Sequence, residues 1–160
     1  MRITWLAALA VAAPRAAAAD PPPAPFAIGE QPAWFVLGGV TGGGTIEFHD
    51  RGGFVGGELS LARLDAGTYI GAFANADYDF GVHGTIVTGG LEAGHKLFGV
   101  DAGPAMRFAG GATELGVAAR VGVGIGAFGV YARYEYFDAA TDAHVIQLGA
   151  TLKLPLTSPF

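Results

Sequence analysis

The 160-residue chain contains no cysteine, and only 14% of its residues are charged. The missing cysteine excludes a disulfide scaffold, a thiolate metal site and a lipid-modified N-terminal cysteine. The charged fraction is low because soluble domains carry about a quarter charged residues. The chain also lacks helical periodicity after Ala33, where 26 of its 27 glycines lie. These absences point away from an ordinary cytosolic protein.

The first 19 residues have the pattern of a cleavable secretory signal: basic Arg2, an apolar stretch over 3–13 and small residues at 17–19. An uncleaved membrane anchor is the alternative, but the apolar stretch is shorter than the roughly 20 residues that span a bilayer. Cleavage removes Arg2 and Arg15 from the 9 basic residues and leaves 14 acidic ones, a net charge of −7. A basic nucleic-acid surface is thereby excluded. Residues 20–32, with PPPAP at 21–25, are expected to form a stiff extended segment.

Alternating apolar and polar residues predict a single all-β domain over 33–160. The expected strands are 34–48, 54–64, 67–79, 84–95, 98–108, 113–124, 127–137 and 144–154, each separated from the next by glycine-rich or Asp-rich turn signals. Eight strands joined as neighbours favour an antiparallel up-and-down meander, which closes into a barrel without free edges.

One face of these strands is ionic and the other is apolar, because successive side chains of a strand point to opposite sides. The ionic face is predicted to carry Glu58, Asp77, Glu92, Lys96, Asp101, Arg107, Glu114, Arg120, Arg133, Glu135 and Lys153. A soluble lipocalin-like barrel would turn this face to water, whereas a membrane barrel would enclose it.

Three features favour the membrane barrel. Glycines alternate with the large charged residues on the ionic face, as a narrow lumen requires, and acids and bases nearly balance, as an enclosed network requires. Aromatic residues also cluster near strand ends, as interfacial girdles do. They are Phe48, Phe54, Tyr78, Phe80, Phe108, Phe128, Tyr136 and Phe137.

The chain resembles the small eight-stranded outer-membrane barrels of Gram-negative bacteria, the class of OmpX and the transmembrane part of OmpA. The resemblance rests on the leader, the meander, "VYARYEYFD" at 130–138, "HVIQLGATLKL" at 144–154 and the terminal Phe160. It implies that Phe160 is a signal for the barrel-assembly machinery, that both termini are periplasmic and that the rim meets lipopolysaccharide. Pro155 and Pro159 depart from the pattern, so the last strand either reaches Phe160 or stops near Leu154.

Motifs for catalysis or ligand binding have weaker support. GIGAFG at 124–129 matches a dinucleotide-binding string, but a strand follows it rather than a helix, so we expect a hairpin there. Ser60 lies beside Glu58 on the ionic face with no histidine base. Glu92 and Glu135 are each expected to form an ion pair with a basic residue of the ionic face. Three rim histidines approach acidic residues without any metal-ligand spacing. They are His49, His83 and His144.

The sequence therefore predicts a non-enzymatic outer-membrane barrel without a cofactor or metal, with a structural or envelope role and a lumen filled by a charged network. An eight-stranded barrel is just wide enough for side chains to fill its interior. Two alternatives remain open at this point: a soluble secreted carrier of an apolar ligand, and a narrow ion-conducting channel. The sequence leaves the oligomeric state undetermined.

Overall fold

The computed structural model describes residues 32–47, 51–138 and 144–160. The expected signal segment, most of the proline-rich segment, Phe48 and His49 lie outside these residues. The strands are β1 (Ala33–Glu47), β2 (Arg51–Asp65), β3 (Thr68–Asp79), β4 (Gly84–His95), β5 (Phe98–Ala109), β6 (Ala112–Ile125), β7 (Phe128–Phe137) and β8 (His144–Pro155). The boundaries expected from the alternation differ from these by at most three residues.

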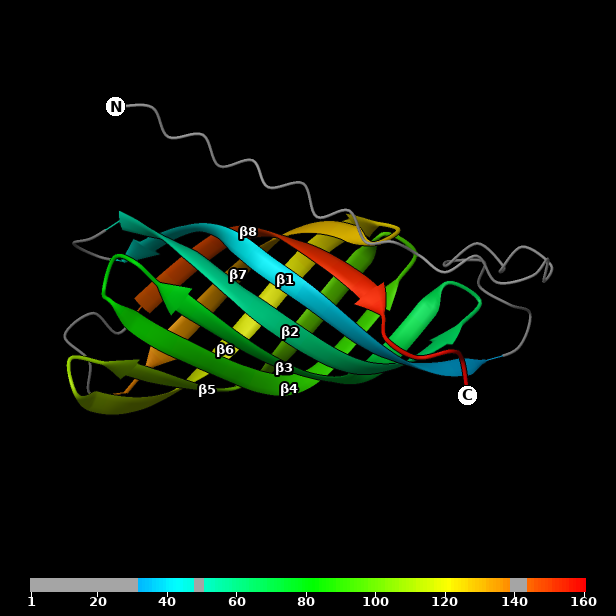
Figure 1. Ribbon diagram of the computed structural model, residues 1–160, viewed down its shortest axis with the longest axis horizontal. Helices are drawn as coiled ribbons and strands as arrows, with labels where there is room; N and C mark the ends of the chain where they lie inside the picture. The colour runs from blue at the N-terminus through cyan, green and yellow to red at the C-terminus, as the bar shows by residue number, and fades with distance from the viewer. Residues whose placement is uncertain (1–31, 48–50, 139–143) are drawn as a thin grey trace, which may run out of the picture.

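Each strand pairs antiparallel with the next, and β1 pairs with β8, so the sheet closes into an eight-stranded up-and-down barrel (Figure 1). The predicted fold is confirmed. We call the end with the β2–β3, β4–β5 and β6–β7 hairpins the turn end, and the opposite end the loop end. Within the described ranges, the protein has no helix long and apolar enough to cross a membrane.

Two of the connections are two-residue turns with left-handed backbone at both positions. Ala66 and Gly67 have φ of 43° and 85°, and Gly110 and Gly111 have φ of 58° and 81°. Turns of this kind match the twist of the flanking strands and therefore fix the register of the hairpin. Gly126, with φ of 62°, lies in the turn between β6 and β7. The GIGAFG string is thus part of a hairpin, as expected.

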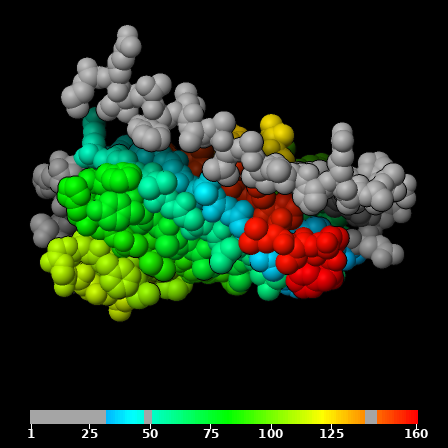
Figure 2. All heavy atoms as spheres, viewed as in Figure 1, coloured from blue at the N-terminus to red at the C-terminus, as the bar shows by residue number. Residues whose placement is uncertain are grey.

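The apolar face of the barrel points outward on every side. Val117, Val130 and Leu148 are 58%, 46% and 53% exposed, whereas Arg120 and Arg133 are 6% and 1% exposed. In the view of Figure 2, side chains of neighbouring strands form a continuous outer wall. A carrier of lipocalin type would need the opposite orientation. The soluble-carrier alternative is therefore wrong.

Exposed aromatic side chains form a band at each end of the outer wall. Trp34, Phe98, Phe128 and Phe160 lie outside at the turn end, and Tyr78, Phe80, Phe108, Tyr134 and Tyr136 lie outside at the loop end. Tyr78 and Phe80 contact edge-to-face with their ring centroids 5.3 Å apart. The prediction of a place in the girdles is wrong for Phe54 and Phe137, because both side chains are buried on the inner face.

The chain after β8 continues to pair with β1, which resolves the question raised by the two prolines. The Leu156 backbone N–H donates to the Val36 carbonyl at 2.8 Å, and Trp34 and Phe160 exchange two backbone hydrogen bonds of 3.0 and 3.2 Å. The Lys153 backbone N–H points toward β7. Because backbone N–H directions alternate along a strand, the nitrogen of Pro155, two residues later, points to the same side, at a level beyond the start of β7. Proline is tolerated there because no ladder bond is lost. Regular strand ends at Pro155, yet pairing resumes at Phe160.

Candidate functional site

The barrel interior contains twelve of the seventeen Asp, Glu, Lys and Arg side chains that the structure describes. Eight acids and four bases lie there, so the interior carries a formal excess of four negative charges. They are Glu47, Glu58, Asp77, Asp79, Glu92, Asp101, Glu114, Glu135, Arg107, Arg120, Arg133 and Lys153. The sequence analysis missed Glu47 and Asp79, although each lies an even number of residues from inward polar side chains of the same strand. The interior is more acidic than the near balance that was predicted.

A lower ionic cluster, closest to the turn end, consists of Glu58, Glu92, Asp101, Arg120 and Lys153. Arg120 donates through Nη1 and Nη2 to the two Glu58 oxygens, at 2.5 and 3.0 Å, and through Nε to Asp101. Its guanidinium also lies 5.0 Å from the ring centroid of Tyr131. Bidentate geometry and a facing aromatic ring are both favourable for arginine. Four strands are thereby joined across the lumen, because these side chains come from β2, β5, β6 and β7.

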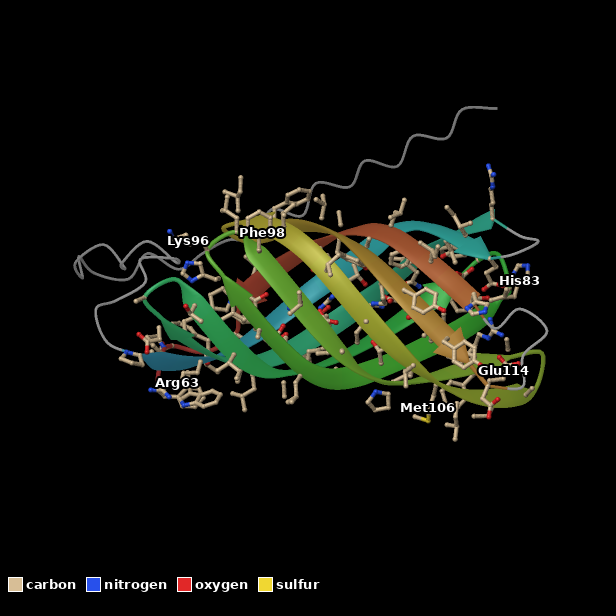
Figure 3. The ribbon with its side chains drawn as sticks, turned by 180° about the vertical axis from the view of Figure 1, so that it is seen from behind. Arg63, His83, Lys96, Phe98, Met106 and Glu114 are labelled. Atoms are coloured by element: carbon tan, nitrogen blue, oxygen red, sulfur yellow. The ribbon has the colours of Figure 1, made fainter. Side chains whose placement is uncertain are left out.

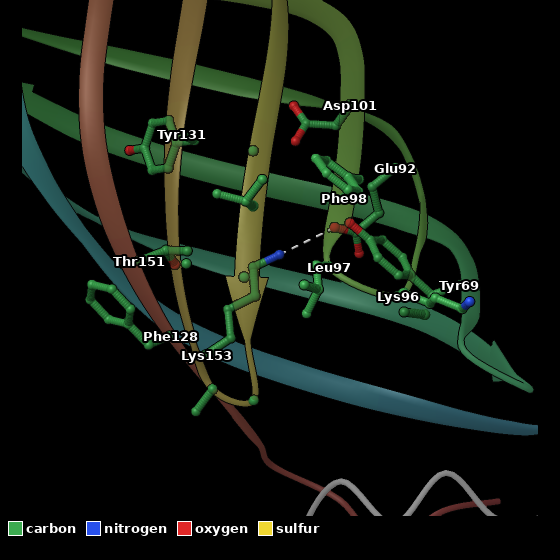
Figure 4. Close-up of a pocket in the computed structure, with 18 of the residues that line it drawn as sticks. Tyr69, Glu92, Lys96, Leu97, Phe98, Asp101, Phe128, Tyr131, Thr151 and Lys153 are labelled. Atoms are coloured by element: carbon green, nitrogen blue, oxygen red, sulfur yellow. Dashed lines mark hydrogen bonds and ion pairs between the residues drawn. The ribbon is translucent and has the colours of Figure 1, made fainter.

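Lys153 extends the lower ionic cluster across the barrel. Its ammonium contacts Glu58, lies 3.2 Å from Glu92 Oε2 and donates to Ser60 Oγ at 3.0 Å. Figure 4 shows the lysine from β8 directed toward Glu92 of β4, on the opposite side of the lumen. Ser60 donates to Glu58 Oε1 at 3.4 Å, so its hydroxyl is part of the charge network. Glu58 and Lys153, the groups beside this hydroxyl that could act as a base, form an ion pair with each other, and Glu58 is also paired with Arg120, so neither is free to take the hydroxyl proton.

A central ionic cluster, Asp77, Arg133 and Glu135, fills the middle of the lumen. Arg133 Nη1 donates to Asp77 at 2.6 Å, to Asn75 at 2.9 Å and to Gln147 at 3.1 Å. Glu135 is fully buried, and its Oε1 lies 3.8 Å from Arg133 Nη1. The carboxylate of Glu135 accepts no hydrogen bond, and Arg133 Nη2 donates none. Packed and imperfectly paired polar groups thus fill the cross-section at this level.

An upper ionic cluster near the loop end is centred on Arg107. Its Nε donates to Glu114 at 2.5 Å, its Nη1 lies 3.5 Å from Glu47, and its guanidinium lies 4.7 Å from the Phe137 ring centroid. Asp79 has a different function, because its Oδ1 accepts the backbone N–H groups of Gly81 and Val82 and so caps the β3–β4 loop.

The prediction that Lys96 belongs to the interior charge network is wrong. It occupies the β4–β5 turn, with φ of 53° and an exposed side chain, at the same end of the barrel as Arg63 and Phe98 (Figure 3). The alternation that placed it inward stops at His95, where the strand ends. The other ten residues of the predicted network lie in the interior clusters.

Inward glycines provide room for the rings that pack between the charges. A Cβ added to Gly149 would lie 2.7 Å from Phe54 and 2.8 Å from Tyr131, and one added to Gly94 would lie 2.2 Å from the Tyr69 ring. Real Cβ atoms do not approach that closely, so only glycine fits beneath these rings. Aromatic rings that cover strand glycines also help to pin the register of a sheet.

A cavity of about 300 Å³ lies at the turn end, between the hairpin turns and the lower ionic cluster. Its inward-facing lining includes Leu37, Leu64 and Tyr69 on one side and glycines of β5 to β7 on the other. The cavity is hollow because Gly99, Gly122 and Gly124 stand where other strands carry large side chains.

Metal and acid–base chemistry have little geometric basis here. The described ranges contain no group of three or more His, Asp or Glu side chains arranged to hold a metal ion. His144 instead contacts the Tyr134 hydroxyl, with Nδ1 and oxygen 2.6 Å apart, and His83 is exposed in a loop. Glu92 and Glu135 belong to different ionic clusters, each beside a base.

A closed eight-stranded barrel with an apolar exterior and an ionic interior is the class that these observations define. Among solved structures, the chain is similar to the crystal structure of neisserial surface protein A, with 11% identity and a TM-score of 0.51 over 78% of this chain and 99% of that chain. At this identity the likeness shows a shared fold. No model of a known protein family matches the chain, and no curated protein does.

Proposed function

We propose that the protein is inserted in the outer membrane of a Gram-negative envelope after export and removal of residues 1–19. The observation that carries this proposal is the orientation of the barrel wall: exposed leucine and valine outside, eight acids and four bases inside. In water this arrangement would leave the whole apolar wall exposed to solvent, while the charged side chains that water solvates best are enclosed. In a bilayer the same wall contacts hydrocarbon, and the two aromatic bands lie at the interfaces.

The proposed role is structural, without catalysis, because the described part of the lumen has no open pore and the groups beside the Ser60 hydroxyl, Glu58 and Lys153, are paired with each other. Arg133, Glu135 and Gln147 fill its middle and are at most 1% exposed. The shared fold with a protein titled a surface protein supports the envelope setting. We further propose that lipopolysaccharide contacts the loop end, where Tyr134, Tyr136 and His144 are exposed, and that the assembly machinery reads Phe160 during insertion.

The experiment that tests the proposal is fractionation of cells expressing the full chain, followed by gel electrophoresis of heated and unheated samples. We expect the protein in the outer-membrane fraction, with a faster unheated band, because a closed barrel remains folded in detergent until it is heated. A soluble protein whose mobility does not depend on heating would contradict the proposal. Deletion of residues 1–19 is the control, and it should leave the protein outside the outer-membrane fraction.

A further inference from the structure

We propose that the cavity at the turn end is a binding site for a small organic cation that joins one ammonium group to a compact apolar body. The site goes beyond the structural role above, because it assigns ligand recognition to a barrel whose lumen is otherwise closed. Its volume, about 300 Å³, is at the small end of the range of ligand pockets.

The walls of the cavity suit an apolar body. Leu37, Leu64 and the Tyr69 ring line one side, and the opposite side is bare strand backbone at Gly122 and Gly124. A flat ring can pack against such a wall without displacing side chains. Figure 4 shows Tyr69 and Tyr131 on different strands around the cavity, with Lys153 and Glu92 across its floor.

The cationic donors on the floor of the cavity are already paired, whereas three oxygen atoms that can accept a hydrogen bond are not. Lys153 directs its ammonium at Glu58, Ser60 and Glu92, and every nitrogen of the Arg120 guanidinium is paired. Glu92 is 4% exposed and its Oε1 has no hydrogen-bond donor. The hydroxyls of Tyr131 and Thr151, which also line the cavity, have no partner either. Each of these three unpaired oxygens can accept a hydrogen bond from the ammonium of a ligand.

The charge of the surroundings has the matching sign. The lower ionic cluster contains three carboxylates and two cations, and the described interior as a whole contains eight acids and four bases. One ammonium would balance the lower ionic cluster, whereas a carboxylate ligand would add to its excess. Lys96 at the rim opposes a cation, but its side chain is exposed and its field is weakened by solvent and salt.

The test uses three probes that share one aromatic body: phenethylamine, 2-phenylethanol and 3-phenylpropanoate. The full mature protein is folded in a nonionic detergent, and binding is followed by chemical-shift changes and calorimetry. We expect phenethylamine to bind with a dissociation constant on the order of 0.1 mM, as suits so few heavy atoms. The alcohol should bind about tenfold more weakly or worse, since it lacks the charge, and the carboxylate should not bind.

Variants locate the site. Leu64→Trp fills the cavity and should abolish binding, and Leu37→Trp provides a second filled variant if the first does not fold. Glu92→Gln and Asp101→Asn should each weaken amine binding about tenfold. Glu114→Gln is the matched control, because it removes an arginine-paired carboxylate from the upper ionic cluster and should leave the affinity unchanged. Heat-dependent gel mobility establishes that each variant is folded.

Each other outcome overturns the proposal. Equal affinity for the amine and the alcohol would show that the ammonium is not recognised. Binding of the carboxylate would show that the floor has the opposite preference. Amine binding that survives in a folded Leu64→Trp or Leu37→Trp variant would place the amine elsewhere, in the micelle or on the outer wall. Absence of amine binding at 10 mM, on the order of a hundred times the expected constant, would remove the site.

Discussion

Replacement of Arg120 by methionine tests whether the lower ionic cluster holds the barrel together. Arg120 is 6% exposed and bonds to Glu58 at 2.5 and 3.0 Å, with a further bond to Asp101. Removal of one partner from a buried ion pair costs about 3–5 kcal/mol, because the remaining carboxylates stay buried. Lys153 still contacts Glu58, so we expect Arg120→Met to lose about 3 kcal/mol, toward the lower end of that range.

The double variant Glu58→Gln with Arg120→Met separates lost pairing from lost packing. It removes the buried carboxylate together with its arginine, and replacement of both members of a buried pair is often close to neutral. We expect it to recover about 2 kcal/mol of the loss, since a neutral amide costs less to bury than an unpaired charge.

Urea unfolding in detergent micelles measures both variants, with Trp34 fluorescence as the signal. The chain has 2 tryptophans, and removal of residues 1–19 takes away Trp5. Linear extrapolation of the free energy of unfolding gives the differences. Arg63→Met, at an exposed position, is the control and should change stability by less than about 0.5 kcal/mol. The reasoning is refuted if Arg120→Met matches this control, or if the double variant is no more stable than the single one.

Three further outcomes are expected. Leu59→Arg, at a 56% exposed position in the middle of β2, should lower stability in lipid vesicles by about 2–4 kcal/mol, because the side chain meets hydrocarbon; an unchanged free energy of unfolding would argue against lipid contact. Gly149→Val should lose at least about 1–3 kcal/mol, since its Cβ would lie within 2.7 Å of Phe54; Gly44→Ala, whose Cβ has no neighbour closer than 3.8 Å, is the control, and equal effects would dismiss the ring contact. The wild-type protein in planar bilayers should give no steady conductance, because the central ionic cluster fills the lumen; regular single-channel steps would show instead that the network opens.

The fold followed closely from the sequence because a strand has a side-chain period of two and the pattern repeats in every strand. Arg120, Arg133 and Glu135 could be placed on one face from parity alone, since each lies well inside a strand. Lys96 could not, because parity fails at the left-handed residue that begins a turn. Strand ends are where alternation has the least predictive value.

The partners within the ionic clusters were not predictable. Lys153 and Glu92 lie on β8 and β4, and no feature of either segment indicates which side chains meet across a closed lumen. Phe54 and Phe137 were assigned to the girdles because they lie near strand ends, yet parity turns both inward. The cavity at the turn end also escaped notice, because a run of inward glycines leaves no chemical signature of its own.

A measurement of lipid contact along the outer wall, by the accessibility of spin labels, tests the account most directly. The chain has no native cysteine, so single cysteines at Leu59, Val117 and Leu148 can carry spin labels without background. In vesicles, we predict that dissolved oxygen relaxes these labels much more strongly than a water-soluble nickel chelate does. Labels that the chelate relaxes as strongly as oxygen does would place the apolar wall in water and contradict the account.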